Sequence, residues 1–135
     1  MEEKNLSLIG KLLFFSHSER ESSYFTNSLV YICDHNPDGA IGLIINRQID
    51  LMTDNLLKGV GLETEDLSTP KNLLIGGPVN PGSVFVLHSS EKKWESTLKI
   101  TSEVSLSTSK DTLQDIAINQ TPDEYLITLG YSGWT

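Results

Sequence analysis

The sequence predicts a single α+β domain built around a mainly antiparallel or mixed β-sheet. Its 135 residues suit one domain with one sizeable core. Short apolar, β-branched segments are interspersed with two helix signals, and hairpins are more evident than strand–helix–strand units. A hydrophobic content of 38% and a charged content of 21% are ordinary for a folded globular chain, so disorder is not expected.

The clearest predicted element is a hairpin at residues 28–47. The four residues 36–39 (Asn-Pro-Asp-Gly) suit a reversal, because proline presets φ and glycine accepts a positive φ. Residues 29–34 and 40–46 therefore predict paired strands. Both segments are apolar on both faces, so we expect them to be central and covered on both sides. Gly42 predicts a bulge or a close backbone approach.

Shorter apolar segments predict the other strands, separated by polar connections. The predicted strands are residues 12–15, 73–75, 84–87, 97–100, 104–106 and 125–129. Residues 16–23 and 89–96 are expected at the surface, with Trp94 the one large apolar residue of the second segment. An acidic connector is predicted at 63–72, and residues 76–82 form the most constrained loop of the chain.

Two helices complete the prediction. The first is expected to begin at about Leu51 after a cap at Asp50 and to end at Gly59 or Gly61. The second begins after Thr108 or Ser109 and carries apolar residues on one face between 113 and 117. The spacing of Thr108 and Asp111 resembles a capping box.

Charge and cysteine content exclude several classes of protein. Ten Lys and Arg stand against 18 Asp and Glu, which disfavours direct nucleic-acid binding. One cysteine permits no internal disulfide and fits a reducing compartment. No signal peptide is recognisable, and no apolar run approaches the ~18 residues that span a bilayer. The sequence therefore predicts a soluble cytoplasmic protein without membrane association.

Cys33 and the histidines are the candidate catalytic residues. Cys33 would act as a nucleophile only if His35, His88 or a helix N-terminus lowered its pKa. The alternative is an inert, buried thiol whose pKa a nearby Asp34 raises, and this alternative is favoured. His88 either lies at the mouth of a pocket or is a hydrogen-bonded histidine at a strand end.

The loop at Gly76, Gly77 and Pro78 is the candidate ligand site. Two glycines after a strand can turn backbone N–H groups toward an anionic small molecule, although a sharp strand exit explains them as well. Paired metal-ligand spacing and nucleotide-binding motifs are absent, so no metal or cofactor is expected.

Five motifs in this order resemble the AlgH/YqgE family of mostly uncharacterised bacterial proteins. They are SLVYICDHNPDGAIGLIIN at 28–46, GGPV at 76–79, FVLH at 85–88, STSKDTL at 107–113 and LGYSGW at 129–134. The resemblance implies a curved, partly barrel-like sheet flanked by helices and a cytosolic bacterial protein. The AlgH name implies transcriptional regulation. The family supplies no established catalytic residues; the positions that match its pattern are Cys33, Asp34, His35, Asn36, Gly39, Gly42, Asn46, Gly76, Gly77, Pro78 and His88.

Family members usually continue past the Gly-Tyr-Ser-Gly-Trp motif, whereas this chain stops at Thr135. We therefore expect residues 1–135 to be one AlgH/YqgE-like domain that lacks the family's C-terminal segment. Missing core elements would leave an apolar edge, which predicts a homodimer.

Two hypotheses of function result. The first is a non-catalytic regulatory protein that binds a protein partner or a small ligand, and its acidic balance favours a basic or mixed protein partner. The second is an enzyme or redox-responsive protein that uses Cys33 with His35 or His88.

Overall fold

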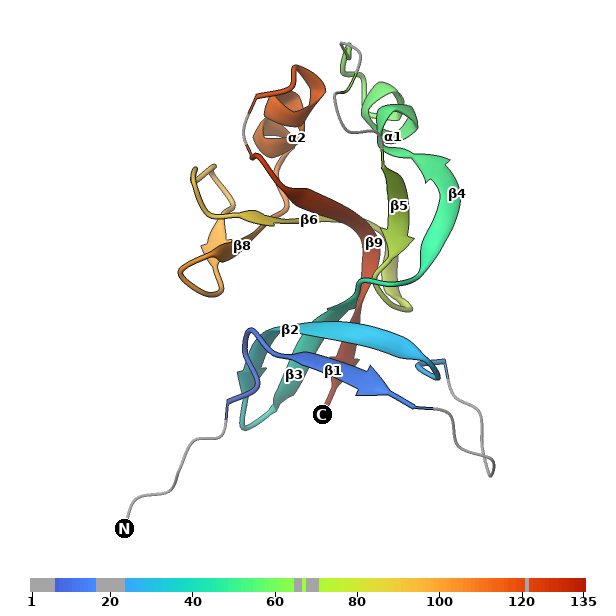
Figure 1. Cartoon of the computed structure of the whole chain (residues 1–135), viewed down its shortest axis with the longest axis vertical. Coiled ribbons are helices and arrows are strands. Elements are labelled where there is room, and N and C mark those ends of the chain that lie inside the picture. The colour runs from blue at the N-terminus through green and yellow to red at the C-terminus, as the bar shows by residue number, and fades with distance from the viewer. Residues whose placement is uncertain (1–6, 17–23, 65–66, 68–70, 121) are drawn as a thin grey trace.

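Strand β9 (Tyr125–Trp134) joins the two parts of the sheet in the computed structural model, which describes residues 7–16, 24–64, 67, 71–120 and 122–135. Its first part pairs antiparallel with β6 (Val79–Ser89), and its last three residues pair with β3 (Gly39–Ile44). Gly130, at φ 77°, lies between the two parts of the strand. Figure 1 shows β9 passing from the part of the molecule that carries the helices to the part that contains β1, β2 and β3.

The predicted hairpin is confirmed as β2 (Ser28–Asn36) and β3, with β1 (Leu12–Phe15) paired to the other edge of β2. The register shifts between Ile32 and Asp34, so a bulge occurs in β2, on the strand paired with Gly42 rather than at Gly42 itself. The close approach at Gly42 is also confirmed, because a Cβ there would lie 2.6 Å from Cγ1 of Val30.

Both faces of the hairpin are covered, as predicted. Tyr31, Cys33 and Leu43 belong to one buried cluster. Val30, Ile32 and Ile44 belong to another, which the aromatic rings of Phe15, Phe25 and Trp134 cover.

The remaining strands form the second part of the sheet. Its order continues from β9 to β6, then β8 (Val104–Ser107) and β7 (Leu98–Lys99), and β5 (Asn72–Ile75) pairs in parallel with β9. The strands predicted near 73–75, 97–100 and 104–106 are confirmed. Two further predictions were wrong. Residues 79–82 were predicted to be a loop, and residues 130–134 were predicted to follow the last strand. Both segments lie within strands, because Val79 of β6 pairs with Tyr131 of β9 before an irregular stretch of β6.

The predicted start of the first helix is wrong. Residues 48–52 form β4 (Gln48–Met52), which pairs with β5, and α1 runs only over Thr53–Gly59. The N–H of Met52 donates to Oδ1 of Asn55 over 3.0 Å, so Asn55 rather than Asp50 caps this end. Pairing with a neighbouring strand outweighs the local helix signal at residues 50–52.

The second helix is confirmed as α2 (Lys110–Ala117), with Ser109 at its N-cap. The expected capping box does not form, because the carboxylate of Asp111 accepts the N–H groups of Glu95 and Thr112 at 3.0 and 2.8 Å.

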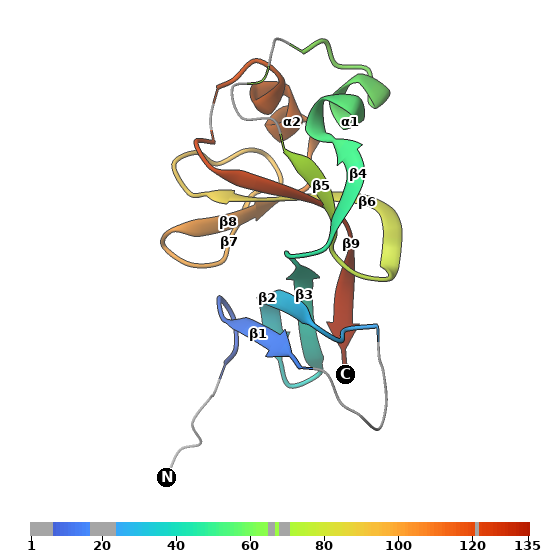
Figure 2. The same cartoon turned by 45° about the vertical axis from the view of Figure 1, so that its right-hand side comes forward.

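The helices cover one face of the second part of the sheet (Figure 2). Leu57 of α1 and Leu113 and Ile116 of α2 pack on Leu73 and Val86. Leu87 faces the other side, where it joins the cluster of Tyr31, Cys33 and Leu43. The chain is thus a single α+β domain with a curled half-barrel sheet, as predicted, and its described residues include two short helices.

Two expectations fall partly or wholly on residues that the structure does not describe. They are the surface segment at 16–23, of which only Ser16 is described, and the acidic connector at 63–72, of which 65–66 and 68–70 are not. Among the described residues, no helix is long and apolar enough to cross a membrane.

Candidate functional site

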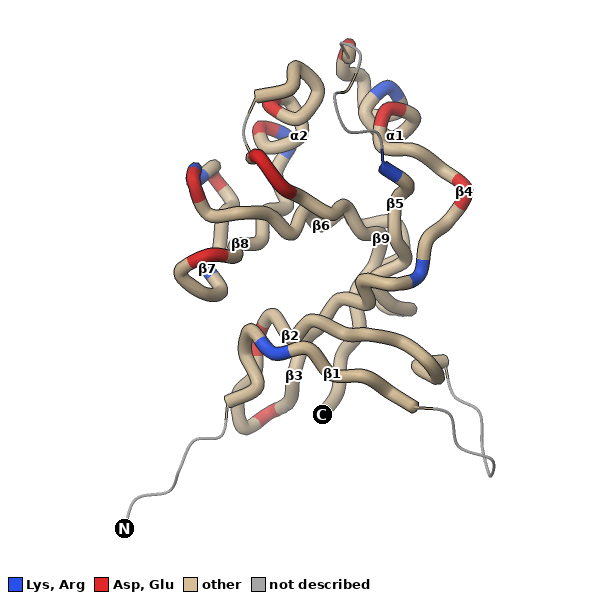
Figure 3. Tube along the Cα trace, in the orientation of Figure 1, with Lys and Arg blue, Asp and Glu red and all other residues tan. Residues whose placement is uncertain are grey.

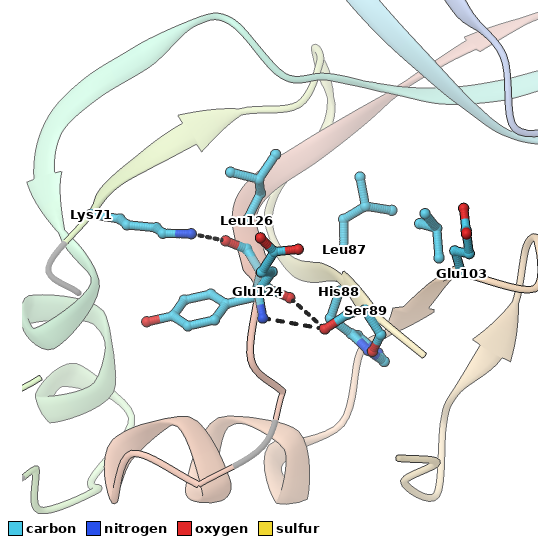
Figure 4. Close-up of a pocket in the computed structure, with 9 residues that line it drawn as sticks. Lys71, Leu87, His88, Ser89, Glu103, Glu124 and Leu126 are labelled. Atoms are coloured by element: carbon cyan, nitrogen blue, oxygen red, sulfur yellow. Dashed lines mark hydrogen bonds between the residues drawn. The ribbon is translucent and has the colours of Figure 1, made fainter. Parts of the chain in front are cut away.

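A hollow of about 640 Å³ lies beside β6, β8 and β9 (Figure 4). We call it the Lys71 groove. Its apolar wall comes from Leu87, Val104 and Leu126, which also border the cluster around Cys33. Its polar rim carries Lys71, Glu103 and Glu124. The groove therefore combines an apolar surface with both signs of charge.

Lys71 is fixed at the groove by two contacts with one residue. Its Nζ donates to the backbone oxygen of Tyr125 over 2.5 Å and lies 4.7 Å from the centre of the Tyr125 ring. Burial lowers the pKa of the Lys71 ammonium, and the nearby carboxylate of Glu124 opposes this effect. One of the three N–H groups of the ammonium is used by this carbonyl, which holds the Lys71 side chain in place, and the ammonium keeps its charge.

The rim beside Lys71 is held by Ser89 and Glu124. The N–H of Ser89 donates to the Glu124 backbone oxygen over 3.0 Å, and Oγ of Ser89 accepts the N–H of Glu124 over 3.2 Å. Glu124 itself is exposed. This backbone pairing leaves the Glu124 side chain at the surface, beside the groove.

His88 lines the groove, but its ring is hydrogen-bonded on the other side of β6. Nδ1 lies 2.8 Å from the Ser89 carbonyl oxygen, which only accepts, so Nδ1 of the neutral ring carries the proton. Nε2 then accepts from Oγ of Ser107 over 2.7 Å. The ring is 3% exposed and packs edge-on against Trp94. The geometry matches the hydrogen-bonded histidine, and the ring does not face the hollow.

Sequence reasoning missed the contribution of residues 94–107 to this environment. Trp94 was expected in an exposed segment, but it is 7% exposed and donates from Nε1 to Asp115 over 3.0 Å. Oγ1 of Thr97 lies 2.7 Å from Oγ of Ser107. The only sequence signal for this environment was Ser107, the first residue of the STSKDTL motif. Nothing in the sequence links Ser107 to His88, which lies 19 positions earlier.

The structure does not bring the candidate catalytic residues together around a substrate site. Cys33 is 4% exposed, and burial, followed by the charge of Asp34, raises the pKa of its thiol to about 12. His35 lies in β2, and its Nδ1 accepts the N–H of Leu8 over 2.9 Å. The bulge after Ile32 changes the alternation along this strand. The described residues contain no group of three or more His, Cys, Asp and Glu placed to hold a metal ion.

The glycines at 76 and 77 allow three strands to meet. A Cβ on Gly76 would lie 2.4 Å from the Gly130 oxygen, and one on Gly77 would lie 2.2 Å from the Tyr131 oxygen. The N–H of Gly76 donates to Leu129, and its oxygen accepts from Ile44. Gly76 is thus fully used in backbone pairing, and Pro78 has no N–H to offer an anion. The geometry favours a strand exit over the anion site.

Comparison with known proteins bears on the whole chain. Residues 13–135 match the family described as AlgH-like. The chain is 46% identical over 116 residues to the "UPF0301 protein" of Dechloromonas aromatica, covering 84% of this chain and 62% of that protein. It is 40% identical over 119 residues to the "UPF0301 protein" of Vibrio cholerae, covering 83% and 63%. The chain thus spans less than two thirds of the length of these relatives.

Two solved structures share the fold. The solution structure of the AlgH protein from Pseudomonas aeruginosa is 31% identical, with a TM-score of 0.79 over 99% of this chain and 71% of that one. A protein of Corynebacterium diphtheriae, 19% identical, has a TM-score of 0.72 over 99% of this chain and 70% of its own, a likeness of fold alone. From the motifs, the half-barrel and these matches, the chain belongs to the AlgH-like family.

Proposed function

We propose that this protein is a non-catalytic regulatory protein that binds a basic, partly apolar segment of a protein partner in the Lys71 groove. The observation that carries the proposal is the pairing, in one hollow, of an apolar wall with two exposed carboxylates, Glu103 and Glu124. Among the lining residues, these two carboxylates stand against one ammonium, that of Lys71. The groove is therefore suited to a ligand that brings its own positive charge.

The dimensions and the overall charge agree with this kind of ligand. A hollow of about 640 Å³ lies within the roughly 300–1,000 Å³ range of sites that hold small molecules or a few side chains. The formal net charge of −8 attracts cationic partners over long distances and repels nucleic acid. Among the described residues, Lys and Arg are dispersed over several elements (Figure 3). Regulation of transcription, if it involves this groove, would then act through a protein.

The test is fluorescence anisotropy with two labelled peptides of equal length, one alternating Lys and Leu and the other alternating Glu and Leu. We expect saturable binding of the basic peptide only. Replacing both rim carboxylates, Glu103→Gln with Glu124→Gln, should weaken its binding about tenfold, because both charges face the ligand. Glu63→Gln, an exposed acid outside the groove, should leave binding unchanged.

Equal binding of the acidic peptide would contradict the proposal, as would a double variant that binds the basic peptide as tightly as the natural chain. A gel shift with duplex DNA provides a second test. Salt-sensitive retention of DNA by the purified protein would contradict the role assigned to a protein partner.

A further inference from the structure

We propose that a second hollow, formed by the β6–β7 connection and the β7–β8 hairpin, binds the phosphate group of a small molecule. This hollow measures about 280 Å³, less than half the volume of the Lys71 groove. Three lysines line it: Lys92, Lys93 and Lys99. They are three of the ten basic residues in a chain that carries 18 acidic ones, so the hollow departs from the charge of the rest of the molecule.

The lysines differ in how far their charge is already compensated. Nζ of Lys92 forms a 2.6 Å ion pair with Asp115 and lies 5.2 Å from the centre of the Trp94 ring. Lys93 and Lys99 form no ion pair with a described residue. Glu91, the one acid of the hollow, directs a carboxylate oxygen to the N–H of Asp123. Two ammonium groups therefore remain available to an anion.

The same hollow is also lined by a pair of serine hydroxyls, of Ser90 and Ser105. Oγ of Ser90 and Oγ of Ser105 are 2.6 Å apart, and Ser105 pairs with Lys99 across the hairpin. The two hydroxyls have two hydrogens and use only one of them in this bond, so the other can point into the hollow. Thr97, also at the wall, accepts the N–H of Trp94 and lies within bonding distance of Ser107, so its hydrogen is used internally.

This donor set selects the class of ligand. Lys93 and Lys99 bring two uncompensated positive charges, of which the single negative charge of one carboxylate would balance only one. A terminal phosphate offers three oxygens and close to two negative charges at neutral pH. The small volume limits the ligand to a phosphate ion or a compact phosphate monoester, which present the same group to the protein.

The experiment is an NMR titration of the whole chain with inorganic phosphate and, separately, glycerol phosphate. Acetate and potassium chloride at matched ionic strength are the comparison salts. We expect saturable shifts of the amides of residues 90–99 and 105 with both phosphate compounds. Lys93→Met with Lys99→Met should weaken binding by about tenfold or more, because both uncompensated charges are lost. Lys58→Met, in the last turn of α1, should have no effect.

The relative affinities identify the source of the group: tighter glycerol phosphate indicates a monoester, and equal affinities indicate the free ion. Shifts that grow linearly and equally with potassium chloride would overturn the proposal. Acetate binding as tight as phosphate would also overturn it, as would unchanged affinity in the double lysine variant. The lysines are exposed, so these substitutions should not disturb folding.

Discussion

Cys33 shows how one side chain's surroundings decide its chemistry. The thiol is buried in the bulged part of β2 between Tyr31 and Leu43. Burial is the larger cause of its raised pKa, and the adjacent charge of Asp34 adds to it. Since the folded-state pKa of about 12 exceeds the ordinary value, the protonated thiol stabilises the folded chain below about pH 9. That contribution is lost as the pH rises toward 12.

At about pH 8 the native protein should react with iodoacetamide on the order of a thousandfold more slowly than free cysteine. The reason is the thiolate fraction, which a pKa of about 12 makes very small. Mass spectrometry of timed samples measures the rate, and the same reaction in urea should proceed at the rate of free cysteine. A native rate within tenfold of free cysteine would instead support the enzyme or redox hypothesis centred on Cys33.

At the scale of the element, the connection from β5 to β6 depends on close backbone contact with β9. Gly76→Ala should destabilise the fold by about 3 kcal/mol, because its Cβ would lie 2.4 Å from the Gly130 oxygen and 2.9 Å from Oγ1 of Thr128. Urea unfolding measures the loss. Gly59→Ala is the matched control: nothing lies within 4 Å of its Cβ, and alanine at this helical position should stabilise by up to about 1 kcal/mol.

If Gly76→Ala unfolds at the same urea concentration as the natural chain, the strand-exit explanation of this loop is wrong. A ligand role for Gly76, Gly77 and Pro78 would then regain support.

The sequence predicted those elements whose signals are local. The 36–39 turn and the cap of α2 at Ser109 depend on residues within a few positions of one another. The predicted start of α1 was wrong because residues 48–52 pair with β5 instead, and β5 lies about 20 residues away along the chain. The second half of β9 was missed since its glycine and serine residues are poor strand formers, and pairing with β3 and β6 decides its conformation.

The candidate sites could be predicted less well than the fold. Cys33, His35 and His88 were selected as reactive residue types, and burial together with hydrogen bonding engages each of them internally. The Lys71 groove joins residues from β6, β8 and β9 with a lysine that precedes β5. Such a set depends on which strands become neighbours, and periodicity does not specify this.

At the scale of the whole molecule, the half-barrel leaves apolar surface on its outer strand. Leu12 and Phe14 of β1 are 53% and 60% exposed, and β1 is the last strand of the sheet on that side among the described residues. An edge strand with exposed large apolar side chains favours association with another chain. We therefore expect homodimerisation to involve β1.

Light scattering at tens of micromolar should give the mass of a dimer for the natural chain and of a monomer for Phe14→Lys. In a dimer, the ammonium group introduced at position 14 would be buried in the interface without a charged partner. In the monomer it extends into solvent, because position 14 is already exposed. Val60→Lys changes an apolar residue that is 37% exposed at the end of α1, away from β1, and should remain dimeric. A natural chain that is monomeric at this concentration contradicts the expectation. If instead Phe14→Lys remains dimeric, association uses another surface. The next surface to test is then β7, at the opposite end of the sheet, where Leu98 is 55% exposed.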